Sequence, residues 1–383
     1  MMLSCKFTWL KRTLRNWPWM QAPHGFAPFY LPYVPRAGDI REWNVEINPP
    51  GIATPRPLPS NNPLRISLHR ILIETGIALT LARTTSDPRS WFALYRYGAD
   101  FAGTAPRLRF YSGVTQKDSR LTAVASEEIA IGIAWYILRQ FFALPHIADV
   151  NECFRTGELR YVHRRLNNRR PDYLCTDSAN DAVLVECKGT TGTRSDISGM
   201  LQDGDTQVRN VTPTNLTLRN TCGRMVIGTH FCVEGKHPRS ETTTIIEDPD
   251  GAESGRDDPE SDMVVRLSYA KCLRFMGQDV FAERLIAKTP MIGFPDLDKE
   301  RLPEIDEIPF LPLGVTPFND LVGIVGPIAM ALLSNIEGNI KKNIADSLPS
   351  LENNTIDLGT KGYILSNGVI VLHDIDSVLE EVI

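Results

Sequence analysis

Two short apolar runs on either side of a polar turn constrain the fold of this chain most. The runs read PDYLC (171–175) and DAVLVECKG (181–189), and the turn between them reads TDSAN. Apolar runs that flank such a turn predict an antiparallel hairpin. If the turn centres on Ala179, the strand register places Asp172 directly across from Glu186.

The predicted register brings two acids and one amine to one face. Side chains alternate along a strand, so Glu186 and Lys188 share a face, and the pairing adds Asp172 to it. Opposed carboxylates repel, and the apolar neighbours indicate burial, where uncompensated charge is costly. One ammonium cannot neutralise two acids, whereas Mg²⁺ is commonly held by carboxylates and keeps waters for a phosphate substrate. We therefore expect an Mg²⁺ site, with Mn²⁺ as the alternative ion and a buried salt bridge as the alternative structure.

These residues resemble the motif of the PD-(D/E)XK nuclease superfamily, whose members have the restriction-endonuclease-like fold. Pro171 and Asp172 are followed by thirteen residues and then by Glu186, Cys187 and Lys188. The resemblance implies that Asp172 and Glu186 ligate the metal, with the Cys187 carbonyl as a further ligand. It also implies that Lys188 orients or helps deprotonate the attacking water and stabilises charge on the phosphate.

The resemblance points to two more residues. Members often carry a metal-holding glutamate on the helix before the first core strand; Glu128 matches best and Glu127 is the rival. An acid favoured only by the helix dipole is the alternative. Many members also have a glutamine on the helix after the lysine strand. Gln207 is the candidate, with Gln202 nearby and a solvated glutamine as the alternative.

A basic run lies just upstream of Asp172. Arginine binds phosphate through planar bidentate contacts, so the run predicts a rim that holds a nucleic-acid backbone, a solvated face being the alternative. Its members are Arg155, Arg160, His163, Arg164, Arg165, Arg169 and Arg170. After Lys188, the stretch GTTGTRSDISG suggests a flexible loop near the scissile phosphate.

The expected fold class is α/β (α+β): a restriction-endonuclease-like mixed sheet flanked by helices, with the resemblance covering about residues 126–286. Residues 1–115, rich in proline and aromatics, predict a loop-dominated region with short strands, one of them at 40–47. Residues 116–290 are expected to form the nuclease-like core. Residues 291–383 are expected to form a small C-terminal α+β region for packing or interaction.

Individual helices and strands are predicted from the spacing of apolar residues and from turn-forming residues. A long apolar helix is predicted from Ser126, a second helix over 267–286 and a buried helix over 321–333, where thirteen mostly apolar residues are too few to span a membrane. The turn Ser366-Asn367-Gly368 predicts a hairpin. Further strands are expected at 146–154 and 224–233, and a mobile acidic insertion at 247–262.

Charge and cysteine usage limit the compartment and the partners. The formal net charge of −5 requires any nucleic-acid contact to come from a local basic patch. Seven scattered cysteines without a Cys-x-x-Cys pair argue against a disulfide framework and a zinc knuckle. The first residues do not form a secretory signal. We expect a cytoplasmic protein with no membrane partner.

The expected activity is that of a metal-dependent endonuclease that hydrolyses phosphodiester bonds of DNA, with RNA left open. A restriction or antiphage-defence role is expected, with a homodimer or an activating protein as partner. The alternative is a catalytically silent nucleic-acid-binding or scaffold subunit that retains the nuclease fold.

Overall fold

A computed structural model was used for the structure of the protein. It describes most of the chain between residues 39 and 373. The described residues are 39–48, 63–80, 92–101, 106–116, 118–162, 169–177, 182–214, 222–236, 241–248, 262–292, 302–315, 320–333, 340, 343–344, 356–358 and 361–373.

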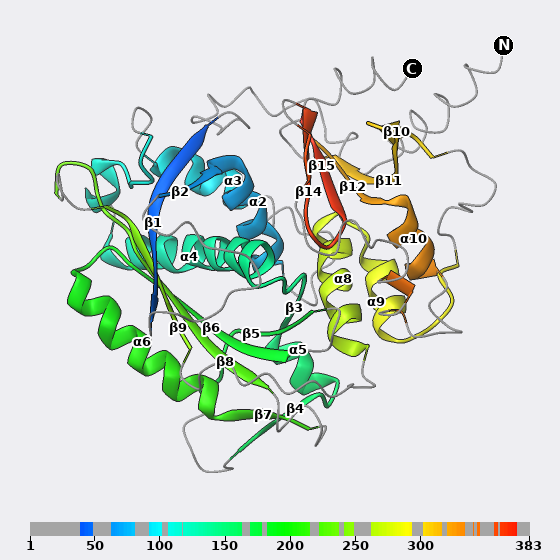
Figure 1. The fold of residues 1–383 in the computed structure, drawn as a ribbon, viewed down its shortest axis with the longest axis horizontal. Helices are drawn as coiled ribbons and strands as arrows, with labels where there is room; N and C mark the ends of the chain where they lie inside the picture. The colour runs from blue at the N-terminus through cyan, green and yellow to red at the C-terminus, as the bar shows by residue number, and fades with distance from the viewer. Residues whose placement is uncertain are drawn as a thin grey trace.

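A mixed sheet runs through the larger part of the described protein (Figure 1). Its strand order is β2-β1-β9-β8-β6-β5-β3. The β1–β9 and β6–β8 pairs are parallel and the others antiparallel. The expected α/β (α+β) class is confirmed. The strands are β1 (Ile40–Asn48), β2 (Leu64–Ser67), β3 (His146–Asp149), β5 (Tyr173–Thr176), β6 (Ala182–Thr190), β8 (Gly223–His230) and β9 (Thr243–Glu247).

The N-terminal region contributes directly to this sheet. Strand β1 confirms the strand predicted at 40–47 and pairs with β9, so residues on both sides of the expected boundary at 115 build one sheet. The same region also contains helix α2 (Leu68–Leu79), which is almost fully buried. The expectation of loops and short strands was wrong here, because the apolar sequence LHRILIETGIAL contains no proline and lies between the proline-rich stretches.

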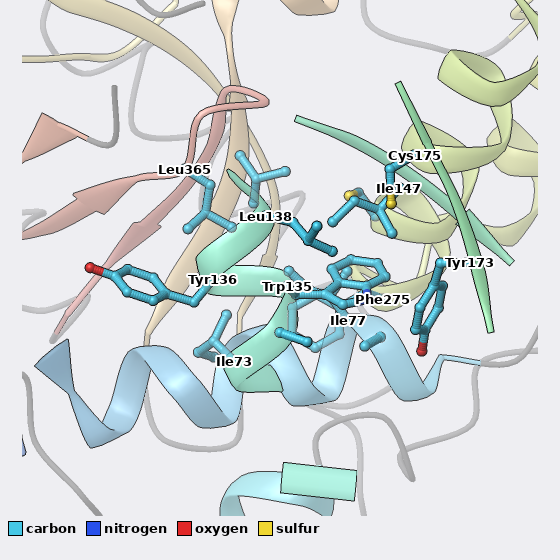
Figure 2. Packing of buried hydrophobic residues seen from close by; sticks show 14 of the residues in the cluster. Ile73, Ile77, Trp135, Tyr136, Leu138, Ile147, Tyr173, Cys175, Phe275 and Leu365 are labelled. Carbon is cyan, nitrogen blue, oxygen red and sulfur yellow. The ribbon is translucent and has the colours of Figure 1, made fainter. Parts of the chain in front are cut away.

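Helix α4 (Ser119–Phe141) packs between the sheet and α2. It begins before the predicted Ser126, because Asp118 caps it by accepting a hydrogen bond from the Arg120 N–H at 2.8 Å. Figure 2 shows Trp135 directed toward Tyr173 and Phe275, whereas Tyr136 leaves the opposite side of the helix. The Trp135 and Tyr173 rings meet edge to face with centroids 5.4 Å apart.

Length and composition would also allow α4 to cross a membrane. It is the described helix that meets both criteria, but 67% of its most apolar window is buried inside the protein. A buried core helix has the same composition, so this feature gives only weak support for a membrane span.

Helix α6 (Arg194–Arg209) covers the other face of the sheet (Figure 1). Its buried side chains Ile197 and Leu201 lie against Gly228 of β8, where a side chain would leave no room for them. The helix begins with a reciprocal cap: the Thr193 hydroxyl accepts from the Asp196 N–H, and the Asp196 carboxylate accepts from the Thr193 N–H.

Three predicted elements are divided differently in the structure. The strand expected at 146–154 ends at Asp149 and continues as helix α5 (Val150–Arg155), with Glu152 in its first turn. The helix expected at 267–286 is two helices, α8 (Met263–Phe275) and α9 (Asp279–Ile286). Gly277 separates them at a φ of 75°, which glycine adopts without strain.

The prediction of a helix over residues 321–333 is wrong for the first half of that range. Leu321–Val325 forms strand β12, and the chain then enters α10 (Gly326–Leu333), with Pro327 in its first turn. Continuous apolar runs of this length suit a buried strand as well as a helix. Here β12 pairs on both sides, with β11 and β15, and this supplies the hydrogen bonds of a central strand.

The C-terminal region forms a second sheet in the order β10-β11-β12-β15-β14-β13. The predicted hairpin at 366–368 is confirmed by the pairing of Tyr363 with Val371 and by a φ of 75° at Gly368. Besides β12, the strands of this second sheet are β10 (Glu304–Ile305), β11 (Ile308–Val315), β13 (Ile356–Asp357), β14 (Gly362–Ile364) and β15 (Val369–Leu372).

Helix α8 lies between the two sheets, with α9 packed beside it (Figure 1). The Tyr269 hydroxyl of α8 donates to the Asn367 carbonyl at 2.8 Å, and Gln278 donates to the Leu313 carbonyl at 2.8 Å. The smaller described elements are α3 (Phe92–Tyr97), the 3-10 turns η2 (Gly98–Asp100) and η3 (Ser112–Gln116), and the paired strands β4 (Leu159–Tyr161) and β7 (Val211–Pro213).

The cysteines of the described residues are all buried: Cys153, Cys175, Cys187, Cys222, Cys232 and Cys272. Most of the acidic insertion predicted at 247–262 lies outside the described residues, as do His163, Arg164 and Arg165 of the basic run.

Candidate active site

The hairpin register predicted from the sequence is confirmed. The paired positions sum to 358 as predicted, from Tyr173 with Val185 to Thr176 with Ala182. Asp172 lies just before β5, and its N–H donates to the Val185 carbonyl at 3.1 Å. The Asp172 carboxylate reaches over the neighbouring strand and accepts a hydrogen bond from the Cys187 N–H at 2.9 Å. This contact places the Asp172 carboxylate at the residue next to Glu186, so the two acids are close neighbours.

Glu186 and Lys188 lie on the face of β6 that α6 covers. A Cβ atom at Gly204 of α6 would stand 3.3 Å from the Glu186 Cγ, so the helix closes tightly over this carboxylate. The Lys188 ammonium donates to Glu186 Oε1. The Glu186 side chain is only 3% exposed and that of Lys188 19%, so the lysine lies toward the solvent and the glutamate beneath it.

Burial controls the charge of the two carboxyl groups. It raises the pKa of Asp172 to about 6, although the Cys187 N–H and the Lys188 charge act in the opposite direction. Burial and then the nearby Asp172 raise the pKa of Glu186 to about 8, against the effect of Lys188. One lysine thus leaves both acids undercompensated.

One oxygen of the pair lacks a partner. Glu186 Oε2 is fully buried and has no hydrogen bond to any residue that the structure describes. A buried carboxylate oxygen without a donor is costly, and a cation is the ligand that would satisfy it. With Asp172 beside it, this donor set is all oxygen and suits a hard divalent ion such as Mg²⁺.

The two glutamates considered on the preceding helix have different surroundings. Glu128 accepts a hydrogen bond from the Tyr97 hydroxyl and lies 3.6 Å from Arg96, so α3 engages it. The charge of Glu127, after that of Asp149, contributes to the raised pKa of Asp172. Ser126, directly before Glu127, donates its hydroxyl to the Gly189 carbonyl of β6 at 3.3 Å, so this turn of α4 lies against β6. Metal binding by either glutamate remains a prediction.

The glutamine candidates are separated by burial. Gln207 is half-buried one turn beyond Gly204, next to the stripe of α6 that faces the sheet, whereas Gln202 is exposed. Within the described residues no hydrogen bond joins the Gln207 side chain to Asp172 or Glu186, and its catalytic role remains a prediction. So does metal ligation by the Cys187 carbonyl; the observed contact of Cys187 is through its N–H.

The loop expected after Lys188 is mostly regular structure. Gly189 and Thr190 complete β6, and residues from Arg194 onward belong to α6. The short connection is held by the Gly192 N–H donating to Thr190 Oγ1 at 3.0 Å and by His230 Nε2 lying 3.0 Å from the Gly192 carbonyl. The expectation of a flexible loop was therefore wrong, because both ends of the connection are capped.

Part of the basic run is free to meet a ligand. Arg160, Arg169 and Arg170 are exposed, and Arg169 is 4.0 Å from Asp203, a distance at which an exposed ion pair is weak. Arg155 is bound to Glu152 through two hydrogen bonds of 2.9 and 2.6 Å.

An acid–lysine pair next to Asp172 was missed. Asp149, at the end of β3, contributes to the raised pKa of Asp172 and accepts a hydrogen bond from Lys271 of α8 at 2.6 Å. Lys271 is separated from Asp149 by 122 positions, so no local spacing could reveal the pair. The pairing of β3 with β5, which sets Asp149 opposite Tyr173, creates it.

Comparisons with known proteins were made with family models, curated proteins and solved structures. No protein-family model matches the chain, and neither the curated proteins nor the solved structures contain a match.

Proposed function

We propose that the chain is a metal-dependent endonuclease of the PD-(D/E)XK type that hydrolyses phosphodiester bonds of DNA. The observation that carries the proposal is the hydrogen bond from the Cys187 N–H to the Asp172 carboxylate, which brings Asp172 next to Glu186, whose Oε2 is buried without a partner among the described residues. The second buried carboxyl group beside it, Asp172, distinguishes this oxygen from Glu74 Oε1, which is also buried without a partner among the described residues but belongs to an ion pair with Arg139.

The residues present fit a divalent ion. Asp172 and Glu186 would hold it, and Glu127 lies close enough to influence Asp172 electrostatically. When bound, such an ion lowers the pKa of water and offsets negative charge on the phosphoryl oxygens. Mg²⁺ is the expected ion and Mn²⁺ the alternative, because the donors are oxygens.

The chain's own groups would complete the site. Lys188 is the partly exposed member of the trio, and its ammonium can donate to a phosphate oxygen while it holds Glu186. Arg160, Arg169 and Arg170 offer exposed guanidinium groups, the last two within three residues of Asp172 in the sequence, and they would bind the neighbouring phosphates.

The biological setting belongs to the same proposal. The basic groups are local in a chain of net charge −5, which favours a nuclease directed to its substrate by a defined surface. We assign it a cytoplasmic restriction or antiphage-defence role. Double-strand cutting with one centre per chain favours a homodimer or an activating protein partner.

Cleavage of supercoiled and linear DNA, and of RNA, tests the proposal in Mg²⁺, Mn²⁺ or EDTA. We expect nicking of DNA with either ion and none with EDTA. Asp172→Asn, Glu186→Gln and Lys188→Met should each lower the rate at least ~100-fold. Lys236→Met, at an exposed lysine, is the matched control and should cut like the wild type.

Two outcomes would remove the proposal. A folded wild type that leaves every substrate intact while it binds DNA equally with and without metal would be a silent binding subunit. Cleavage that survives the Asp172 and Glu186 substitutions would come from another site or from a contaminant.

A further inference from the structure

Two histidines and an aspartate meet in the C-terminal half of the molecule, in a place that the proposed nuclease chemistry does not use. His69 Nε2 lies 3.0 Å from Asp320 Oδ2, and His373 Nδ1 lies 3.1 Å from Asp320 Oδ1. One potential ligand atom from each residue falls within 4.8 Å of the other two. The two imidazole rings stand nearly perpendicular, with centroids 4.7 Å apart.

The strand register fixes two of the three residues. Leu321 pairs with Leu372, so Asp320 just before β12 and His373 just after β15 are the next opposed pair. The His373 N–H donates to the Lys361 carbonyl at 2.8 Å, which anchors its backbone beside β14. The third residue, His69, comes from the first turn of α2, 251 positions from Asp320.

The surroundings of these three residues resemble those of a metal site whose ligands are in place before the ion binds. Both His69 and Asp320 are buried, and the His373 side chain is 13% exposed. The Tyr363 hydroxyl lies 3.5 Å from His69 Nδ1, so the ring nitrogen that faces away from Asp320 has a polar neighbour of its own. Outer contacts of this kind orient metal-binding imidazoles. His373 Nε2 is buried and has no partner within the described part of the chain.

We propose that His69, Asp320 and His373 form a binding site for a divalent transition-metal ion of the Zn²⁺ class. The ligand atoms are His69 Nε2, His373 Nδ1 and one oxygen of Asp320. Two imidazoles and one carboxylate are a recurrent ligand set for such ions, with water in the remaining position. The hard ion Mg²⁺ prefers oxygen donors, so this site and the nuclease centre select different metals.

The ion would join parts of the chain that are distant in sequence. It would tie α2, which packs on α4 beneath the main sheet, to β12 and β15 of the C-terminal sheet. Binding only to the folded arrangement, it would stabilise the whole protein in proportion to its free concentration.

Cobalt substitution tests the site on the full-length protein after removal of bound metal with a chelator. We expect one Co²⁺ per chain, seen as a visible d–d absorption band, displaced by one equivalent of Zn²⁺ and not by Mg²⁺. Zn²⁺ should also raise the Tm of the wild type by several degrees. Asp320→Asn and His373→Gln should weaken binding at least ~10-fold.

Three controls distinguish loss of this metal site from loss of nuclease activity and from unfolding. His230→Gln, at a histidine whose Nε2 lies 3.0 Å from the Gly192 carbonyl, should retain the band. Glu186→Gln should retain it too, so that loss of nuclease activity and loss of this site are separable. Far-UV circular dichroism shows whether the Asp320 and His373 variants are folded, and Tyr363→Phe provides a milder change at a residue beyond the ligands.

The proposal is overturned if folded wild type takes up no stoichiometric Co²⁺ or Zn²⁺. The same conclusion follows if the band survives both ligand substitutions in folded protein, or disappears only with Glu186→Gln. In those cases the three residues are a hydrogen-bonded cluster alone.

Discussion

At the scale of single residues, protonation of the two carboxyl groups of the candidate site affects the stability of the folded protein. Asp172 and Glu186 have pKa values raised to about 6 and about 8, chiefly by burial. In the unfolded chain both groups titrate near ~4. Between these limits the folded protein holds protons that the unfolded chain releases, so the free energy of unfolding falls as the pH rises.

We therefore predict that the ion-free protein loses stability from about pH 4 to about pH 8, and that the loss then levels off. Glu186→Gln removes the larger contribution and should flatten the profile by on the order of 2 kcal/mol. Denaturant unfolding of both proteins in EDTA at several pH values measures this. Histidines and surface acids are common to the two proteins and cancel in the difference. Parallel profiles would show that Glu186 titrates normally.

Bound Mg²⁺ should counteract the loss of stability that the ion-free protein shows as the pH rises. A carboxylate must be deprotonated to bind an ion, so the ion should raise the Tm more at pH 8 than at pH 6. Equal Tm shifts at the two pH values, or none, would contradict ion binding by these acids.

At the scale of elements, the approach of β6 to α4 depends on a glycine beside the candidate site. A Cβ at Gly189 would overlap the Ser126 carbonyl and stand 2.8 Å from the Ala130 Cβ. We predict that Gly189→Ala costs about 1–3 kcal/mol of stability and lowers nuclease activity by displacing the adjacent Lys188. Gly199→Ala in α6, where nothing lies within 4 Å, is the matched control.

The control should be neutral or more stable by up to ~1 kcal/mol, because alanine is the better helix former. Urea unfolding of the two variants gives both values. A Gly189 variant as stable and active as the wild type would mean that the strand and helix separate without cost.

The contact between α2 and α4 contains a fully buried ion pair. Arg139 of α4 donates to Glu74 of α2, both side chains are 0% exposed, and burial raises the Glu74 pKa. We predict that Glu74→Ala destabilises the protein by about 3–5 kcal/mol, since it strands a buried guanidinium. The double variant Glu74→Leu/Arg139→Leu should be much less affected, and chemical denaturation distinguishes the two. Equal losses would indicate that packing, not the unpaired charge, determines the cost.

Sequence reasoning succeeded where a pattern was local. The turn around Ala179 determined the pairing of β5 with β6, and Ser366-Asn367-Gly368 determined that of β14 with β15. It failed where only packing decides. The apolar run from Leu321 became a strand because β11 and β15 flank it. His69 and Asp320 meet across 251 positions, beyond any spacing rule.

At the scale of the whole molecule, the two sheets are held together by buried polar contacts as well as by apolar packing. Tyr269 and Cys272 of α8 are fully buried; Tyr269 donates to the Asn367 carbonyl, and the Asn367 amide lies 3.5 Å from the Cys272 sulfur. The C-terminal sheet therefore covers a helix that the main sheet also needs.

We predict that a chain ending at Ile292 is insoluble or unfolds at a much lower temperature, because α8 loses the cover over one side. Soluble yield and thermal unfolding followed by circular dichroism measure this. Tyr269→Phe in the full chain is the mild comparison and should cost about 1 kcal/mol. A truncated protein with the Tm of the full chain would show that the C-terminal sheet is an independent unit.

The parallel pairing of β1 with β9 has a consequence for biosynthesis. Asn48 and Glu247 are partners in that pairing, 199 positions apart. At translation speeds of about 5–20 residues per second, the first strand leaves the ribosome roughly 10–40 s before its partner exists. Trp43 and its neighbours must be shielded during that interval, while the hairpin carrying Asp172 and Glu186 can already close. Nascent chains of this protein are therefore expected clients of ribosome-associated chaperones.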